Sequence, residues 1–255
     1  MAATSSPGQI SWSQSPSTLT LTTNRVDIWK VSLDESPAED STAEVTAGVL
    51  STDEVARAHR FHFERDRLHF TRCRSALRNL LARYLVIPAD KIHFEFMASG
   101  KTYIAADQNP ERLQFNVSHS GGIALIAIGS ERRLGVDIEK IRGDVDTGSL
   151  AERFLSVRER AGLQALPEHL RVAGFYACWA RKEAFLKATG QGLSFPLSDF
   201  SVTTHPDRVP ELEEIRGNGG SGKRWFLSDV SVADAYRATV ASDGSYFELR
   251  TYAWN

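Results

Sequence analysis

The sequence is poor in cysteine, in long apolar runs and in excess basic charge, and each shortage excludes a class of protein. Its two cysteines, Cys73 and Cys178, are too few and too far apart for a disulfide framework or a cysteine-rich zinc site. The longest apolar run, residues 123–129, is too short to span a bilayer. The 30 Lys and Arg against 32 Asp and Glu give a net charge of −2, which disfavours a globally basic nucleic-acid binder.

The N-terminal region also lacks the features of a targeting segment. No basic residue precedes Arg25 and no apolar segment follows Met1, so we expect a cytoplasmic protein with no membrane partner. Residues 1–24 are rich in Ser, Thr and Pro and are expected to form a flexible tail. The remaining length is enough for one large domain or two small ones.

The order of expected helices and strands indicates the fold class. A helix is expected from Ser51 to about Leu85, because Ser51 to Glu54 supply capping residues and the leucines then recur at helical spacing. Gly121-Gly122 favours a hairpin between residues 113–120 and 123–130. Further helices are expected at 149–165 and 174–189, and further strands at 26–33, 134–138, 197–203, 224–232, 235–242 and 246–253. This order predicts an α+β fold with an N-terminal subdomain (25–132) and a C-terminal subdomain (133–255).

Two motifs could carry metal or phosphate chemistry. On a strand, Asp137 and Glu139 point to the same face, where their charges repel unless a cation such as Mg²⁺ or basic groups neutralise them. A solvated edge strand explains the same pair. Glu183 and Lys187 share one face of a helix and could supply a third carboxylate and a phosphate-binding lysine, or form an ordinary surface ion pair.

Polar and basic residues in the first half could bind an anion. Ser118 and His119 face opposite ways on an extended chain, so they are poorly placed as nucleophile and base. Phosphate binding, with help from main-chain N–H groups near Gly121, suits them better, although a lone SHS segment is more often simply a turn with polar residues. Eight arginines between Arg57 and Arg83 form either a solvated helix face or an anion-facing surface.

The order of these motifs resembles the 4′-phosphopantetheinyl transferase superfamily. The resembling segments are FNVSHSGG (115–122), GVDIEK (135–140), RFLSVRE (153–159) and WARKEAFLKATGQGL (179–193). The resemblance runs from about Arg25 to the C-terminus. The length is similar to that of the Sfp-type, pseudo-dimeric members, which are about twice as long as the acyl-carrier-protein synthase type.

This resemblance implies two similar subdomains related by a pseudo-twofold axis, each a small antiparallel sheet packed with helices, with coenzyme A and Mg²⁺ between them. It implies transfer of 4′-phosphopantetheine from coenzyme A to a serine of an apo carrier protein, with release of adenosine 3′,5′-bisphosphate. The carrier would belong to a fatty-acid, polyketide or peptide synthase, as in secondary metabolite biosynthesis, and the enzyme would be a monomer.

The resemblance also implies roles for individual residues. Asp137, Glu139 and Glu183 match the metal-binding acids. Glu183 is the leading candidate for the base that takes the serine proton, directly or through metal-bound water, and Lys187 matches the lysine beside the phosphates. Thr102 stands where the family has proline. Residues expected to contact coenzyme A are Arg57, Lys101, Ser118, His119 and Lys187, and Leu193 and Phe195 are expected to contact the carrier.

Two other functions are compatible with parts of the sequence. A non-catalytic paralogue that binds coenzyme A or a carrier protein would not need the acids at positions 137, 139 and 183, all of which are present. A Mg²⁺-dependent phosphohydrolase would need the same acids but leaves the SHS and WxxKEA segments unexplained. We therefore expect the transferase.

Overall fold

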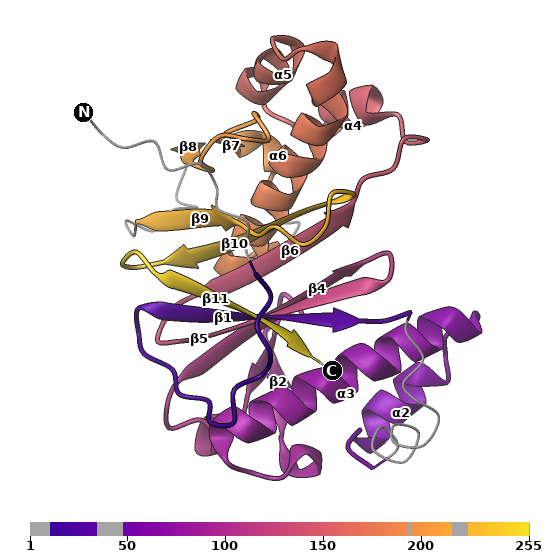
Figure 1. Ribbon diagram of the computed structural model, residues 1–255, viewed down its shortest axis with the longest axis vertical. Helices are drawn as coiled ribbons and strands as arrows, with labels where there is room; N and C mark the ends of the chain where they lie inside the picture. Colours follow the sequence, from indigo (N-terminus) through magenta and orange to yellow (C-terminus); the bar gives the residue numbers. More distant parts are fainter. Residues whose placement is uncertain (1–10, 35–47, 193–194, 216–223, 255) are drawn as a thin grey trace.

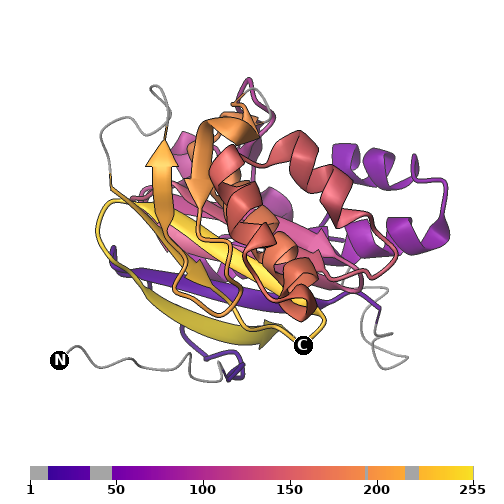
Figure 2. The ribbon, with the colours of Figure 1, turned by 90° about the horizontal axis from the view of Figure 1, so that it is seen from above.

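The computed structural model describes residues 11–34, 48–192, 195–215 and 224–254, which form an α+β fold as the sequence predicts. Two sheets lie next to each other, one in the strand order β11-β1-β5-β4 and the other in the order β6-β10-β9. Helix α3 packs on the first sheet and α6 on the second (Figure 1). In Figure 2, strands β1 and β11 lie on the side away from the helices.

The elements have the following bounds. The helices are α2 (Thr52–Ala58), α3 (Glu64–Leu85), α4 (Thr147–Phe154), α5 (Val157–Gln164) and α6 (Glu168–Thr189), with short 3-10 helices at Ala89–Lys91, Ala106–Gln108 and Leu197–Asp199. The strands are β1 (Arg25–Ser32), β2 (Phe94–Phe96), β3 (Thr102–Ile104), β4 (Leu113–Ser120), β5 (Ile123–Ser130), β6 (Leu134–Lys140), β7 (Phe200–Val202), β8 (Leu212–Ile215), β9 (Trp225–Asp229), β10 (Tyr236–Asp243) and β11 (Glu248–Trp254).

The predicted β4–β5 hairpin is confirmed, with Ser120 paired to Ile123 across the two glycines. Gly121 has a φ of 57°, in the left-handed region that favours glycine. A Cβ at this position would also lie 2.7 Å from the Tyr236 hydroxyl. The turn therefore favours glycine here, and a larger residue would also have to displace the end of the Tyr236 side chain.

The single helix predicted from Ser51 to Leu85 is wrong, because the structure has two helices with a break at residues 59–63. The reason is a buried ion-pair cluster: the Glu54 carboxylate accepts hydrogen bonds from both Arg74 and Arg78. On one continuous helix, Glu54 and Arg74 would be separated by about 30 Å. The break folds α2 back so that these charges meet.

The two ends of the chain also depart from the linear division into subdomains. Strand β11 lies in the predicted C-terminal subdomain, yet it pairs in parallel with β1 of the first sheet. Residues 11–24, assigned by sequence to the flexible tail, are held by contacts: Ser13 pairs with Tyr252, and the Trp12 indole donates to the Ser231 carbonyl. Residues 1–10 lie outside the described part of the chain.

The two sheets share a buried apolar interface. Val26, Ile28 and Leu125 from the first sheet pack with Val136 and Val240 from the second. Beside this cluster, β4 and β6 meet at the boundary between the subdomains, where the Val136 N–H donates to the Asn116 side chain. Within the ranges that the structure describes, no helix is both long enough and apolar enough to cross a membrane.

Candidate active site

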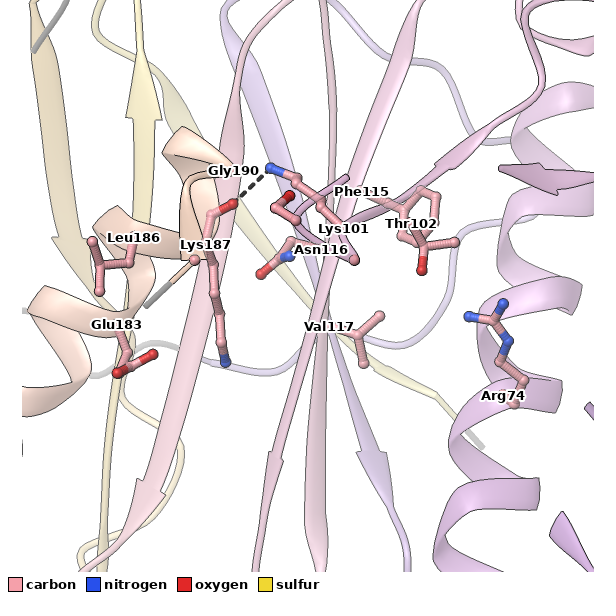
Figure 3. A pocket seen from close by; sticks show the side chains of 13 residues that line it. Arg74, Lys101, Thr102, Phe115, Asn116, Val117, Glu183, Leu186, Lys187 and Gly190 are labelled. Carbon is pink, nitrogen blue, oxygen red and sulfur yellow. Dashed lines mark hydrogen bonds between the residues drawn. The ribbon is translucent and has the colours of Figure 1, made fainter. Parts of the chain in front are cut away.

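A cavity of about 320 Å³ lies at the boundary between the two subdomains. Its walls come from α3, the β2–β3 connection, β4 and α6 (Figure 3). Of the residues expected from the sequence to bind metal or coenzyme A, Lys101, Glu183 and Lys187 line it. Phe115 and Val117 of β4 form an apolar part of the wall. The cavity is thus lined by apolar, acidic and basic groups from both halves of the chain.

Three of the sequence motifs meet beside this cavity. The Lys187 ammonium donates to Asp137 Oδ1 at 2.6 Å and to the Ser118 hydroxyl at 2.9 Å. The Ser118 hydroxyl in turn donates to Asp137 Oδ1 at 3.0 Å. Since these residues belong to α6, β6 and β4, the tertiary structure joins segments up to 69 residues apart. Glu183 lies one helical turn before Lys187, on the same side of α6 (Figure 3).

The three acids predicted as metal ligands affect one another. Burial raises the pKa of Asp137, although the Lys187 ammonium opposes this effect. Burial, and next the Asp137 charge, raise the pKa of Glu139 to about 7 and shift that of Glu183 in the same direction. The surroundings of these carboxylates therefore contain too little positive charge to compensate them fully.

The donor set suits a hard divalent cation. Asp137 Oδ2 is buried and has no hydrogen-bond partner among the residues that the structure describes. Carboxylate oxygens are the protein ligands that Mg²⁺ prefers, and a cation would satisfy this oxygen and lower the mutual repulsion of the acids. Among the described residues, no three acidic, histidine or cysteine side chains already form a complete metal-binding cluster. The fit thus rests on Asp137 Oδ2 and on the chemistry of the carboxylates.

Lys101 lines the cavity with its stem, but its ammonium points elsewhere. It donates to the main-chain carbonyls of Leu134, Lys187 and Ala188 at 2.9, 2.7 and 3.3 Å. Figure 3 shows the bond to Lys187. Burial, aided by the Arg133 charge, lowers the pKa of Lys101 to about 8. The three ammonium hydrogens are thus directed to the start of β6 and the end of α6, where a cation also suits the helix dipole.

The other predicted coenzyme contacts lie outside the lining of the cavity. Ser118 is buried beneath Lys187. The burial of His119, and next the charge of Lys187, lower the pKa of His119. The Arg57 guanidinium of α2 lies 5.2 Å from the centre of the Phe70 ring. Arg74, which the sequence marked only as part of an arginine-rich run, does line the cavity.

Phe195, expected to contact a carrier, is half-buried, with its ring 5.7 Å from that of Phe200. Leu193 lies outside the described residues. Within the described chain, the loop after α6 therefore presents Phe195 partly to the core of the second subdomain.

Two family models match the chain. The model of the 4′-phosphopantetheinyl transferase superfamily matches residues 133–241, and the model of the 4′-phosphopantetheinyl transferase N-terminal domain matches residues 36–131. The boundary between the two matches coincides with the β5–β6 connection, where the chain passes from the first sheet to the second.

Relatives match over most of the chain. It is 34% identical over 236 residues to the 4′-phosphopantetheinyl transferase HetI of Nostoc sp., covering 92% of this chain and 95% of the relative. It is 30% identical over 208 residues to a 4′-phosphopantetheinyl transferase of Bacillus subtilis, covering 80% and 88%. The human L-aminoadipate-semialdehyde dehydrogenase-phosphopantetheinyl transferase is 29% identical over 212 residues, covering 77% and 69%. With the motifs assembled at one cavity, these matches make the chain a member of the 4′-phosphopantetheinyl transferase superfamily, of the Sfp type.

Proposed function

We propose that this protein transfers 4′-phosphopantetheine from coenzyme A to the serine hydroxyl of an apo carrier protein and releases adenosine 3′,5′-bisphosphate. Membership of the superfamily supports the reaction. The observation that carries the assignment of the site is the meeting of Lys187, Asp137 and Ser118 beside a cavity at the subdomain boundary. The closeness of cationic, acidic and apolar groups supports the binding of a nucleotide at this cavity.

Coenzyme A combines an aromatic base with a pyrophosphate and a 3′-phosphate, so its site needs apolar surface and several cations. Phe115 and Val117 offer the apolar surface for the base. Lys187 and His119 are the groups proposed to bind the pyrophosphate, and Arg57 the group proposed to bind the 3′-phosphate. Lys101, whose ammonium is directed to main-chain carbonyls, would contact the nucleotide through its stem.

Asp137, Glu139 and Glu183 are the residues that would hold Mg²⁺. When bound, Mg²⁺ would neutralise negative charge on the pyrophosphate as its P–O bond breaks. The unpaired Asp137 Oδ2 supports this proposal. Lys187 would keep its contact with Oδ1 of the same carboxylate, so the two oxygens of Asp137 would have separate partners.

The proposed reaction is an attack of the carrier serine on the phosphorus next to pantetheine. The bond between the serine oxygen and this phosphorus forms, and the bond from phosphorus to the bridging pyrophosphate oxygen breaks. Glu183 would accept the serine proton on a carboxylate oxygen, and its raised pKa suits this role. The Lys187 ammonium would stabilise the charge that develops on the departing adenosine bisphosphate.

The proposed acceptor is a carrier domain of a fatty-acid, polyketide or peptide synthase. We propose that the acceptor serine approaches the cavity along the wall formed by Gly190 and Gly192, which follow α6. We propose that the enzyme acts as a monomer, since both halves of the proposed site lie on one chain. We also propose that it acts in the cytoplasm.

Intact-mass spectrometry of an apo carrier protein tests the proposal. Incubation with the enzyme, coenzyme A and Mg²⁺ should add one phosphopantetheine, and EDTA should prevent the addition. Glu183→Gln should abolish transfer and leave the circular dichroism spectrum unchanged. Full activity of this variant would remove Glu183 from the mechanism, and no transfer by the wild type to carriers of all three kinds would refute the proposed reaction.

A further inference from the structure

Strands β4 and β6 lie side by side at the subdomain boundary but belong to different sheets (Figure 1). Polar side chains of β4 take the place of main-chain pairing between them. The main-chain N–H groups of Val136, Ile138 and Lys140 donate to the side-chain oxygens of Asn116, Ser118 and Ser120, at 2.8, 3.4 and 3.0 Å. The donors and the acceptors both recur at every second residue, as the alternation of a strand requires.

These side-chain contacts supply hydrogen-bond acceptors that the N–H groups of β6 need. The opposite edge of β6 pairs with β10, so the edge that faces β4 carries N–H groups that need acceptors. A serine hydroxyl has two acceptor lone pairs and one proton, so it can accept from an N–H group and still donate once. Alanine would leave the N–H group unpaired, and a main-chain ladder would leave no hydroxyl proton for a second partner.

The remaining proton of each serine goes to one of the two acids of β6. The Ser118 hydroxyl accepts from Ile138 N and donates to Asp137 Oδ1 at 3.0 Å. The Ser120 hydroxyl accepts from Lys140 N and donates to Glu139 Oε2 at 3.2 Å. The same unit is therefore repeated two residues further along both strands. Each unit ties a carboxylate to the main chain of the residue that follows it.

We propose that Asn116, Ser118 and Ser120 are positioning residues that fix β6 and thereby aim the Asp137 and Glu139 carboxylates. This inference rests on the proposed function, in which these acids hold the metal. It assigns roles to Asn116 and Ser120, which the sequence motif alone did not provide. It also gives Ser118 a role within the protein, in agreement with its burial beneath Lys187.

Ser120→Ala is the sharpest test, because Ser120 does not line the cavity and its hydroxyl, among the described residues, bonds only groups of β6. Ser130→Ala is the matched control: it removes a serine hydroxyl from the far end of the same hairpin, where the hydroxyl donates to the Glu111 carbonyl. Ser120→Thr keeps the hydroxyl and should behave like the wild type.

Three measurements on the full chain compare the Ser120→Ala variant with the wild type: Mn²⁺ affinity, exchange of the Lys140 amide, and the KM for coenzyme A. Titration with Mn²⁺ in the presence of coenzyme A reports metal affinity without turnover. Electron paramagnetic resonance measures the free ion, and the result is corrected for Mn²⁺ binding to coenzyme A alone. Hydrogen exchange of the Lys140 amide reports the contact itself. We expect Mn²⁺ binding to Ser120→Ala to weaken about ten-fold, as for other residues that orient metal ligands. The Lys140 amide should exchange faster, and the KM for coenzyme A should change less than two-fold.

Several results would overturn the inference. Unchanged Mn²⁺ affinity in a folded Ser120→Ala variant would show that the hydroxyl does not aim Glu139. A loss of coenzyme A affinity with metal affinity intact would make Ser120 a direct ligand contact. An equal loss of Mn²⁺ affinity in Ser130→Ala, or a failure of Ser120→Thr to restore Mn²⁺ binding, would make the effect unspecific. Absence of transfer by the wild type would instead refute the proposed function and leave the Mn²⁺ and exchange measurements interpretable.

Discussion

The buried ion pair between Lys182 and Glu159 gives a prediction with a large expected effect. Both side chains are fully buried, and the Lys182 ammonium donates to the two Glu159 oxygens at 2.7 and 2.8 Å and to the Phe200 carbonyl at 2.6 Å. Glu159 also accepts from the main-chain N–H groups of Ser156 and Val202. Lys182 stands directly before Glu183, the proposed base, so the pair ties this part of α6 to α5 and β7.

Lys182→Met removes the cation and leaves the Glu159 charge buried with two main-chain donors. Breaking a buried pair in this way costs about 3–5 kcal/mol of unfolding free energy. For a chain of this length, the loss corresponds to a decrease in Tm of roughly 10 °C. Urea unfolding followed by circular dichroism measures the first quantity, and a thermal scan measures the second.

A second variant separates charge from packing. In Lys182→Met/Glu159→Gln the buried charge is removed but the side-chain carbonyl acceptor for Val202 N–H is kept, so the double variant should regain about 2 kcal/mol relative to Lys182→Met. The exposed pair of Arg142 and Asp144 is the control, and Arg142→Ala should not change Tm measurably. The reasoning is refuted if Lys182→Met loses less than about 1 kcal/mol or if the double variant is no more stable than the single one.

Other positions give further predictions. A Cβ at Gly135 would lie 2.1 Å from the Ala184 carbonyl oxygen, so Gly135→Ala should lose about 3 kcal/mol in urea unfolding, and unchanged stability would contradict this close approach. Burial lowers the pKa of Lys101 to about 8 from 10.5, so between these values the unfolded chain binds more protons than the folded one. The wild type should therefore gain about 1 kcal/mol of unfolding free energy relative to Lys101→Met between about pH 7 and 9, and a constant difference would argue against the lowered pKa. Burial raises the pKa of Cys73 to about 12 and raises that of Cys178 as well. Mass spectrometry should therefore show no alkylation of the native protein by iodoacetamide, and rapid alkylation would show that a thiol is accessible.

Features set by neighbouring residues could be predicted from the sequence. Alternation along a strand placed the Asp137 and Glu139 carboxylates on one face, and helical spacing placed Glu183 and Lys187 on another. The glycine pair marked the β4–β5 hairpin, which the structure confirms. These patterns act within a few residues, so the sequence contains all the information they need.

Features that depend on partners distant in sequence required the tertiary structure. The break between α2 and α3 follows from the meeting of Glu54 with Arg74 and Arg78, which no local pattern encodes. The return of β11 to the first sheet depends on pairing with β1 at the other end of the chain.

The features of the candidate site also fall into those determined by neighbouring residues and those determined by distant partners. The sequence by itself determined which residues carry charge and which of them share a face of a strand or helix. Only the tertiary structure decided that the Lys101 ammonium meets carbonyls 33 and 86 residues away, and that the serines of β4 bond the acids of β6. The physical reason is that a hydrogen bond depends on the positions of both partners, and packing of the two subdomains sets those positions.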